Sequence, residues 1–440
     1  MAPPVLKTEG SIPMIDLNLI REQPDKVREA LLKRGEDVDF SELLDFDRQR
    51  RQKISEVEGL RSRRNQVSEE ISILRRDHQP ADNLIEEMRS VASQIKVLDV
   101  ELAEIEKLIA DFLDQLPNLP DDDVPAGGKE NNQVMRTWGE KPDFQDGISD
   151  HVEICERLGL VDYDRGVKLG GANFWVYTGQ GAILEWALIN YFIEFHLRDG
   201  YEFILPPHIL LYECGYTAGQ FPRFGEEVFH ITGEESSTSK QFLLPTAETA
   251  LVNLHRDEIL EEEQLPKKYF AYTPCYRKEV GSYRAAERGT LRGHQFNKVE
   301  MFQFTLPEKS TEAHEELLSR AERLVQGLEL HYQVTKLAAQ DISGAMAKTY
   351  DVEVWIPSLE RYTEVSSISN ARDYQSRRGK IRFKRTRGKK TEYVHTLNAS
   401  GLATSRLFAA LVEQHQQADG SVVVPEVLRK WAGIDRITAA

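Results

Sequence analysis

Residues 271–304 read AYTPCYRKEVGSYRAAERGTLRGHQFNKVEMFQF and contain two strand-like segments on either side of a loop rich in glycine and arginine. The flanks, Phe270 to Arg277 and Gln295 to Phe304, carry the aromatic and β-branched residues typical of strands. The planar guanidinium of an arginine suits a pair of phosphate oxygens, because its donors meet them as a fork. We therefore predict an antiparallel hairpin that holds a nucleoside triphosphate. A solvated basic loop is the simpler alternative.

Three further segments extend this pattern. They are LPTAET at 244–249, TEVSSISN at 363–370 and TLNASGLATSRLFAAL at 396–411. In the last of them small residues precede Arg406, which opens an apolar helical stretch. That order predicts a strand, a turn and a helix, with a cation at the start of the helix.

Together these segments resemble the signature motifs of class II aminoacyl-tRNA synthetases, and most closely those of seryl-tRNA synthetases. YRKE at 276–279 is similar to the second class motif, ASGLATSR at 399–406 to the third, and GYEFILPP at 200–207 to the first. The resemblance extends from Met14 to about Lys430. It implies that L-serine is activated with ATP and Mg²⁺ to seryl-adenylate and pyrophosphate. Serine is then transferred to serine tRNA, with selenocysteine tRNA as a second candidate acceptor.

The resemblance also implies a role for each matching position. Arg277 and Arg406 would be catalytic, the first clamping the α-phosphate and the second facing the far end of the triphosphate. ATP would be bound by Arg277, Lys278, Glu279, Gly293, Phe296, Glu364, Val365, Ser366, Ser367 and Arg406, with Glu364 and Ser367 as the Mg²⁺ ligands. Serine would be bound by Thr246, Ala247, Glu248, Glu300 and Ser400. Glu300 can accept a hydrogen bond from the serine hydroxyl, and an alanine substrate would leave that acceptor unpaired.

Several positions depart from the family pattern. RAAERG at 284–289 replaces a run like GRDTRG, which puts the contacts with the acceptor end of tRNA in doubt. Gly293 replaces a larger residue and would loosen the adenine pocket; Ala218, Ile368, Ala399 and Ser405 also differ. Two alternatives stay open. One is a specialised paralogue, either an inhibitor-resistant duplicate or a supplier of seryl-tRNA to a biosynthetic pathway. The other is an inactive tRNA-binding or scaffold homologue.

Composition indicates a cytoplasmic enzyme. The chain has 440 residues and a net charge of −16, which argues against diffuse affinity for nucleic acid but not against a local basic surface. There is no apolar run near membrane-spanning length, so we expect no membrane partner. The three cysteines are isolated, which favours neither a disulfide framework nor a zinc site. Residues 1–13 are expected to be a disordered extension without a targeting pattern.

Residues 14–116 are predicted to form a small helical cap and a coiled-coil arm. Apolar residues at 84–116 alternate four- and three-residue steps, and a basic helix precedes them across the break DHQPADN. An antiparallel hairpin of such helices would be roughly 50 Å long. A dimerisation coiled coil is the alternative, but the family resemblance implies a tRNA-binding arm. The candidate phosphate contacts are Arg61, Arg63, Arg64, Arg75 and Arg76.

The remaining chain is predicted to be a linker at 117–137 and a catalytic domain at 138–440. Its strand candidates do not alternate regularly with helices, so an antiparallel sheet flanked by helices is expected and the fold class is α+β. GYEFILPP resembles the motif that forms the class II dimer interface, which implies a homodimer.

Overall fold

The computed structural model describes residues 15–144, 147–231, 240–279, 288–388 and 390–439. The chain divides into two compact units. A helical unit comprises Met1–Leu31 and Glu36–Pro117, and a sheet unit comprises Leu32–Gly35 and Asn118–Ala440. The expected extension at 1–13 and the loop substitutions at 284, 286 and 287 lie outside the described residues.

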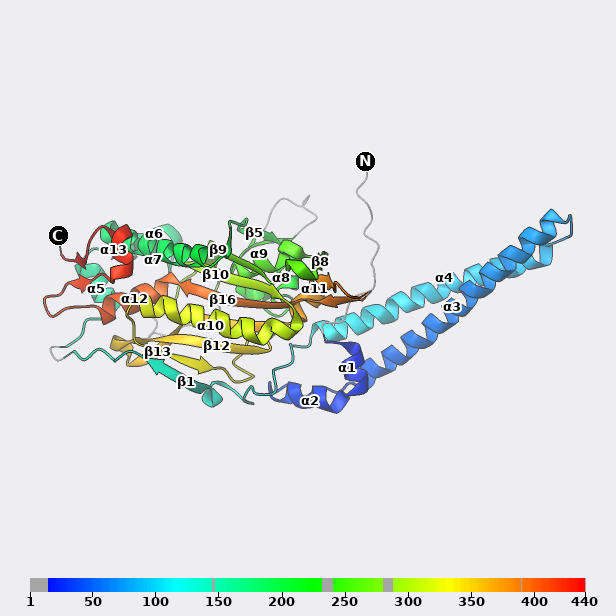
Figure 1. Cartoon of the computed structure of the whole chain (residues 1–440), viewed down its shortest axis with the longest axis horizontal. Coiled ribbons are helices and arrows are strands. Elements are labelled where there is room, and N and C mark those ends of the chain that lie inside the picture. Colours follow the sequence, from blue (N-terminus) through cyan, green and yellow to red (C-terminus); the bar gives the residue numbers. More distant parts are fainter. Residues whose placement is uncertain (1–14, 145–146, 232–239, 280–287, 389, 440) are drawn as a thin grey trace. The chain divides into compact units, whose positions relative to one another are not determined.

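The helical unit is built from two short helices and one long helical hairpin. α1 (Leu17–Glu22) and α2 (Pro24–Leu32) precede α3 (Ser41–Arg76) and α4 (Asp82–Asp114). Figure 1 shows α3 and α4 running side by side, in blue and cyan. Their contact is an apolar seam in which Val57 and Val67 of α3 meet Met88, Val91 and Ile95 of α4. The heptad spacing of α4 therefore predicts the buried face correctly.

Ion pairs line the seam. Lys53 pairs with Glu101, Arg61 Nη2 lies 3.0 Å from Asp99 Oδ1, and Arg63 Nη2 lies 3.2 Å from Glu87 Oε1. Each pair joins a cation of α3 to a carboxylate of α4. Flanking charges of this kind fix the alignment of two coiled-coil helices.

The sheet unit is organised around one eight-stranded sheet. In spatial order its strands are β1 (Gln133–Trp138), β11 (Tyr332–Lys336), β12 (Lys348–Ile356), β13 (Arg361–Arg372), β16 (His395–Ala403), β10 (Gln295–Thr305), β9 (Lys267–Tyr276) and β4 (Glu202–Ile204). All neighbours are antiparallel except β4 and β9, which are parallel. The predicted antiparallel sheet is thus confirmed, with one parallel pair at its edge.

Helices cover this sheet. Figure 1 shows α10 (Ser310–Gly327) lying along β12, β13 and β16. Its buried residues Leu317, Leu318, Ala321, Leu324 and Val325 recur at helical spacing, which turns one apolar face to the sheet. α7 (Gly179–Arg198) and α12 (Thr404–Gln414) contribute Phe192, Phe408 and Leu411 to the same core. The core therefore fixes the strands that carry candidate site residues.

Shorter elements complete the unit. The helices are α5 (His151–Arg157), α6 (Tyr163–Gly170), α8 (Tyr212–Thr217), α9 (Glu248–Leu251), α11 (Tyr374–Arg378) and α13 (Glu426–Ala432). The small sheets pair β2 (Val161–Asp162) with β3 (Val176–Tyr177) and β17 (Val422–Val423) with β18 (Arg436–Ile437). Two three-stranded sheets have the orders β5 (Ile209–Leu211), β7 (Gln241–Leu243), β6 (His230–Ile231), and β15 (Thr391–Tyr393), β14 (Arg382–Lys384), β8 (Ile259–Glu261).

The linker predicted at 117–137 extends too far. Gln133 to Trp138 form β1 and pair with β11, so the sheet begins inside that range. Earlier in the range, the buried side chain of Asn118 donates to the carbonyls of Ala345 and Ala371 at 2.9 and 2.8 Å. The proline and glycine cluster ends at Gly128, and the β-branched and aromatic residues that follow it are strand formers.

Candidate active site

The hairpin of β9 and β10 places the first group of candidate residues. Phe296 is paired with Cys275 across the hairpin, and Arg277 follows the end of β9. The Arg277 guanidinium lies 5.2 Å from the centre of the Phe296 ring, and its Nε donates to the carbonyl of Pro245 at 3.2 Å. The backbone N–H of Lys278 donates to the carbonyl of Glu227 at 2.9 Å. A cation and an aromatic face thus lie together where the nucleotide is expected.

The other strand of the hairpin returns next to Glu279. Arg292 Nε donates to Glu279 Oε2 at 2.7 Å, so the carboxylate of this expected ATP-binding residue is held by an ion pair. Gly293 is buried, and a Cβ there would come within 2.1 Å of the Trp175 ring. The Trp175 ring therefore occupies the space that a larger side chain at this position would need.

The expected serine-binding residues gather around Glu300, which is fully buried. Thr246 Oγ1 donates to Glu300 Oε2 at 3.2 Å, and Asn398 Nδ2 donates to Glu300 Oε1 at 3.2 Å. Lys298 forms a buried ion pair with Glu300 and donates to Thr246 Oγ1 at 2.7 Å. The register of β10 and β16 pairs Glu300 with Ser400. A charged, fully hydrogen-bonded group of this kind suits a small polar ligand.

Glu248 is the first residue of α9 and follows the buried Ala247. Its Oε1 accepts from Gln375 Nε2 at 2.6 Å. Burial, and then the neighbouring Glu300 carboxylate, raise the pKa of Glu248 to about 7. Two carboxyls of one group thus differ in their environment, since Glu300 has the Lys298 ammonium as its partner and Glu248 has a neutral amide.

The third group lies on β12 and β13. The Ser367 hydroxyl donates to Asp351 and lies 3.4 Å from Glu364 Oε1. Burial and the Glu364 carboxylate raise the pKa of Asp351. Burial acts to raise the pKa of Glu364 as well, but the cations Arg406 and Arg277 lower it. Within the described ranges, no three His, Cys, Asp or Glu side chains are grouped as a metal site.

Arg406 connects this third group to the hairpin. Its Nη1 donates to the carbonyl of Glu364 at 2.8 Å and lies 3.4 Å from Glu364 Oε2. Its Nε donates to the carbonyl of Leu291 at 3.2 Å. Val365 is buried beside Glu364, and the Ser366 hydroxyl donates to the carbonyl of Ser400. Residues from three distant segments are therefore in mutual contact.

Comparison with known families and proteins identifies the same family as the sequence motifs. The family described as tRNA synthetase class II core domain (G, H, P, S and T) matches residues 230–415, and the seryl-tRNA synthetase N-terminal domain matches residues 14–120. A Clostridium acetobutylicum protein named serine–tRNA ligase 2 is 60% identical over 96% of this chain and 100% of its own length. A Thermodesulfovibrio yellowstonii serine–tRNA ligase is 46% identical over 96% and 100%. The chain belongs to the seryl-tRNA synthetase family.

Solved structures of seryl-tRNA synthetases agree. The Pyrococcus horikoshii enzyme, complexed with ATP, is 34% identical with a TM-score of 0.89, covering 97% of this chain and 100% of that one. The cytoplasmic enzyme of Naegleria fowleri, in complex with AMP, is 30% identical with a TM-score of 0.86, covering 97% and 99%. The family and the aminoacyl-tRNA ligase activity predicted from the motifs are confirmed, and so is the α+β fold predicted from the order of the strand candidates.

Sequence reasoning missed four polar residues of this synthetase site. They are Lys298, Asp351, Gln375 and Asn398, which contact Glu300, Ser367, Glu248 and Glu300 respectively. Lys298 and Asp351 had a signal, because each is a charged residue next to an apolar or aromatic residue in a strand-like segment. Gln375 had none, because an amide in a helix is unremarkable until its partner is known, whereas Asn398 lies inside the segment TLNASGLATSRLFAAL but was given no role there.

In the helical unit of this synthetase, the five candidate tRNA contacts fall into two groups. Arg61 and Arg63 are engaged by carboxylates of α4. Arg64, Arg75 and Arg76 are exposed, and they have no ion-pair partner among the residues that the structure describes. Only the second group is fully available to an outside anion. No helix of the described chain has the length and apolar character needed to cross a membrane.

Proposed function

We propose that the protein is a serine–tRNA ligase that works in two steps. The serine carboxylate attacks the α-phosphorus of ATP and releases pyrophosphate. The 3′-terminal hydroxyl of serine tRNA then attacks the carbonyl of seryl-adenylate and releases AMP. The observation that carries the proposal is the group Thr246, Lys298, Glu300 and Ser400 in a chain that aligns over its length with serine–tRNA ligases.

Each step needs the reacting groups to be held in position and the developing charge to be stabilised. It does not need a nucleophile from the protein. Arg277 would stabilise the charge that develops at the α-phosphate, with the base stacked on Phe296. Arg406 would meet the far end of the triphosphate. The other proposed ATP contacts are Lys278, Glu279, Gly293, Glu364, Val365, Ser366 and Ser367. The proposed serine contacts are Thr246, Ala247, Glu248, Glu300 and Ser400.

Mg²⁺ fits the group on β12 and β13. Glu364, Ser367 and Asp351 provide hard oxygen donors, which this ion prefers. Burial raises the pKa of Asp351, and the neighbouring Glu364 carboxylate acts in the same direction. Bound there, Mg²⁺ would neutralise phosphate charge. Glu364 and Ser367 remain the proposed ligands, with Asp351 holding the Ser367 hydroxyl.

We further propose a cytoplasmic homodimer. α7 exposes Ile183 and Trp186, which are 46% and 57% exposed, and Leu205 directly after β4 is 72% exposed. Large exposed apolar side chains mark interaction surfaces when they cluster. Sedimentation of Trp186→Glu should show a monomer if α7 lies in the dimer contact, and an unchanged dimer would place the contact elsewhere.

The decisive experiment is ATP–pyrophosphate exchange with serine, threonine, alanine and glycine in parallel. Serine-dependent exchange is expected, and Arg277→Ala should reduce it by roughly 10²–10³-fold because the variant lacks one charge-assisted hydrogen bond to the phosphate. If none of the four amino acids supports exchange, the protein is the inactive homologue. Faster exchange with another amino acid would indicate the specialised paralogue.

Deleting residues 42–114 separates activation from tRNA capture. The shortened protein should keep serine-dependent exchange and lose aminoacylation of serine tRNA. Charging at the normal rate would show that the hairpin of α3 and α4 serves another purpose.

A further inference from the structure

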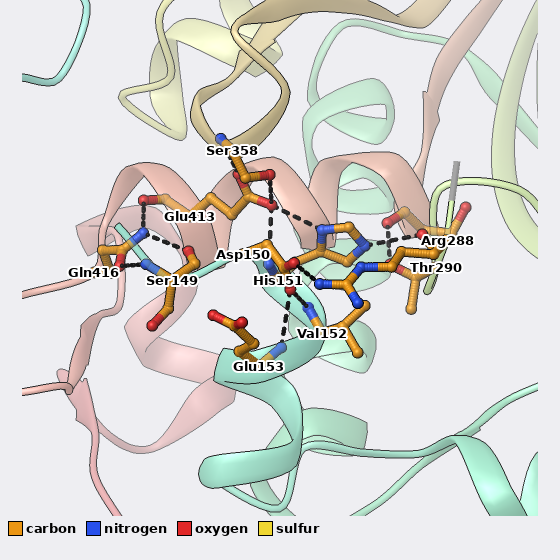
Figure 2. Close-up of polar contacts among 11 residues, drawn as sticks. Ser149, Asp150, His151, Val152, Glu153, Arg288, Thr290, Ser358, Glu413 and Gln416 are labelled. Carbon is orange, nitrogen blue, oxygen red and sulfur yellow. Dashed lines mark hydrogen bonds and ion pairs between the residues drawn. The ribbon is translucent and has the colours of Figure 1, made fainter. Parts of the chain in front are cut away.

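A buried polar cluster joins the start of α5 to the last turn of α12 (Figure 2). His151 is 2% exposed and Glu413 is fully buried. Glu413 Oε1 lies 2.7 Å from His151 Nδ1 and accepts from the His151 backbone N–H at 2.9 Å. The backbone N–H and the hydroxyl of Ser358 also donate to the Glu413 carboxylate, both at 2.9 Å. This carboxylate is therefore held from several sides.

The cluster ends on the backbone of the ATP-binding hairpin. His151 Nε2 lies 3.1 Å from the carbonyl oxygen of Arg288. Arg288 is the first described residue of the segment 288–294, which leads back into β10 and is called here the return limb. A carbonyl and a carboxylate both accept, so each of the two ring nitrogens of His151 lies against an acceptor. Figure 2 shows the ring between the two partners.

The return limb also contacts the N-cap residue of α5 and the first turn of α12. The Arg288 guanidinium pairs with Asp150, directly before His151. The Thr290 hydroxyl donates to the carbonyl of Ser405 at 3.1 Å, and the Leu291 carbonyl accepts from Arg406 Nε at 3.2 Å. A displacement of the limb at Arg288 would therefore be transmitted over three residues to the Arg406 guanidinium.

Gly289 shows how closely the limb packs on the ring. Its φ is +72°, and a Cβ built there would lie 2.4 Å from His151 Nε2. The backbone has no room for a side chain on the face that meets the histidine.

We propose that Asp150, His151 and Glu413 form a clamp that sets the position of the return limb and, through the Leu291 carbonyl, of the Arg406 guanidinium. His151 is on this proposal a positioning residue for nucleotide binding. It contacts the limb and not the proposed substrate residues, so its loss affects ATP more than serine. The effect on KM values that this proposal predicts rests on the proposed adenylation reaction.

The test compares His151→Ala with two matched variants. His415→Ala removes a different histidine, the residue that follows α12, whose Nε2 is 2.9 Å from the carbonyl of Leu328. His151→Gln keeps a donor that can reach the Arg288 carbonyl. Thermal unfolding and the KM values for ATP and for serine in pyrophosphate exchange are measured for each protein.

His151→Ala should raise the KM for ATP roughly tenfold, the effect of a misplaced charge-assisted hydrogen bond. The KM for serine should change by less than about twofold on the same reasoning. His151→Gln should recover part of the ATP affinity, and His415→Ala should lower only the unfolding temperature. An unchanged KM for ATP in His151→Ala, or an equal rise in His415→Ala, overturns the proposal.

Two additions keep the outcome decisive. If His151→Ala does not fold, Gly289→Ala displaces the limb without removing the buried imidazole and should give the same rise in the KM for ATP; a normal KM for ATP there overturns the clamp. Calorimetric binding of ATP with magnesium, without serine, separates this inference from the proposed function. A protein that binds ATP but exchanges no amino acid rejects the proposed function, while the variants' ATP affinities still decide the clamp. A protein that does not bind ATP rejects both.

Discussion

Lys298 and Glu300 form a buried ion pair on one face of β10. Residues two apart in a strand point to the same side of a sheet, so the strand itself places the two charges together. Lys298 also bonds Thr246, which bonds Glu300 in turn, and the three side chains close a ring. This ring organises the proposed serine site more than any one of the residues expected there from the motifs.

Removing the ammonium from this ring should be costly. Lys298→Met leaves the Glu300 carboxylate buried without its partner, and breaking a buried pair in this way costs about 3–5 kcal/mol. We expect a large fall in the free energy of unfolding and a raised KM for serine. Lys309→Met is the matched control, because the Lys309–Glu312 pair is exposed and such pairs contribute about 0–1 kcal/mol. Equal effects of the two substitutions would contradict the prediction.

Glu300→Gln should weaken the discrimination between serine and alanine. The neutral amide is a poorer acceptor for the serine hydroxyl, whereas alanine has no hydroxyl to lose. The ratio of kcat/KM for serine to that for alanine in pyrophosphate exchange should fall roughly tenfold. The KM for ATP serves as the internal reference and should stay the same. A full preference for serine in this variant would mean that another group recognises the hydroxyl.

Glu248 should make stability depend on pH. The folded protein keeps the Glu248 proton up to about pH 7, while the ordinary pKa of 4.5 applies in the unfolded chain. The folded state therefore binds more protons between these values, and the free energy of unfolding falls as the pH rises through that window. Glu248→Gln should remove this part of the fall, at most about 3 kcal/mol at 1.36 kcal/mol per pKa unit.

Urea titrations at pH 4.5 and pH 7.5 measure this difference. All five tryptophans lie in the sheet unit, so their fluorescence reports the unfolding of that unit alone. Glu185, whose pKa burial also raises to about 7, is present in both proteins and cancels in the comparison. A constant difference between the two proteins across the range would count against the prediction.

The arginines of α3 should differ in how much they contribute to tRNA binding, depending on whether each forms an ion pair with α4. Arg64, Arg75 and Arg76 are exposed without a carboxylate partner in the described chain, whereas Arg61 and Arg63 are paired with α4. Replacing the first three by Gln should weaken binding of serine tRNA and reduce its salt dependence by about one unit of slope for each phosphate that is no longer neutralised. Replacing the paired two should have a smaller effect. Filter binding at several salt concentrations tests this, and the opposite ranking would refute it.

Gly293 and Trp175 should behave as a coupled pair. Gly293→Ala directs a Cβ into the Trp175 ring, and overpacking of this kind costs about 1–3 kcal/mol. Trp175→Leu makes room, so the double variant should lose less stability than the sum of the single changes. Thermal unfolding of the four proteins gives the coupling. Strict additivity would show that the ring can move away at no cost.

The elements that local pattern determines could be predicted from the sequence. The heptad steps of 84–116 indicate the buried face of α4, and the strand-like flanks of 271–304 become β9 and β10 with nearly the expected bounds. β1 escaped prediction because it follows a proline- and glycine-rich stretch and its partner, β11, lies about two hundred residues later.

The same distinction applies to the site. Motif residues could be named because each lies in a recognisable local sequence. Their partners could not, because contacts such as Gln375 with Glu248 depend on how distant segments meet. The histidine at 151 lies in no motif at all, and only the fold brings it to the backbone of Arg288.

Strand β10 carries Phe296, Lys298 and Glu300 at alternate positions, with an uninterrupted register against β9. In the proposed function, one strand would thus serve both the nucleotide and the amino acid. An insertion or deletion of a single residue between Phe296 and Glu300 would turn everything beyond it to the opposite side of the sheet. Descendants of this chain can therefore acquire a new amino-acid preference by exchanging side chains on β10, but not by altering the length of the strand.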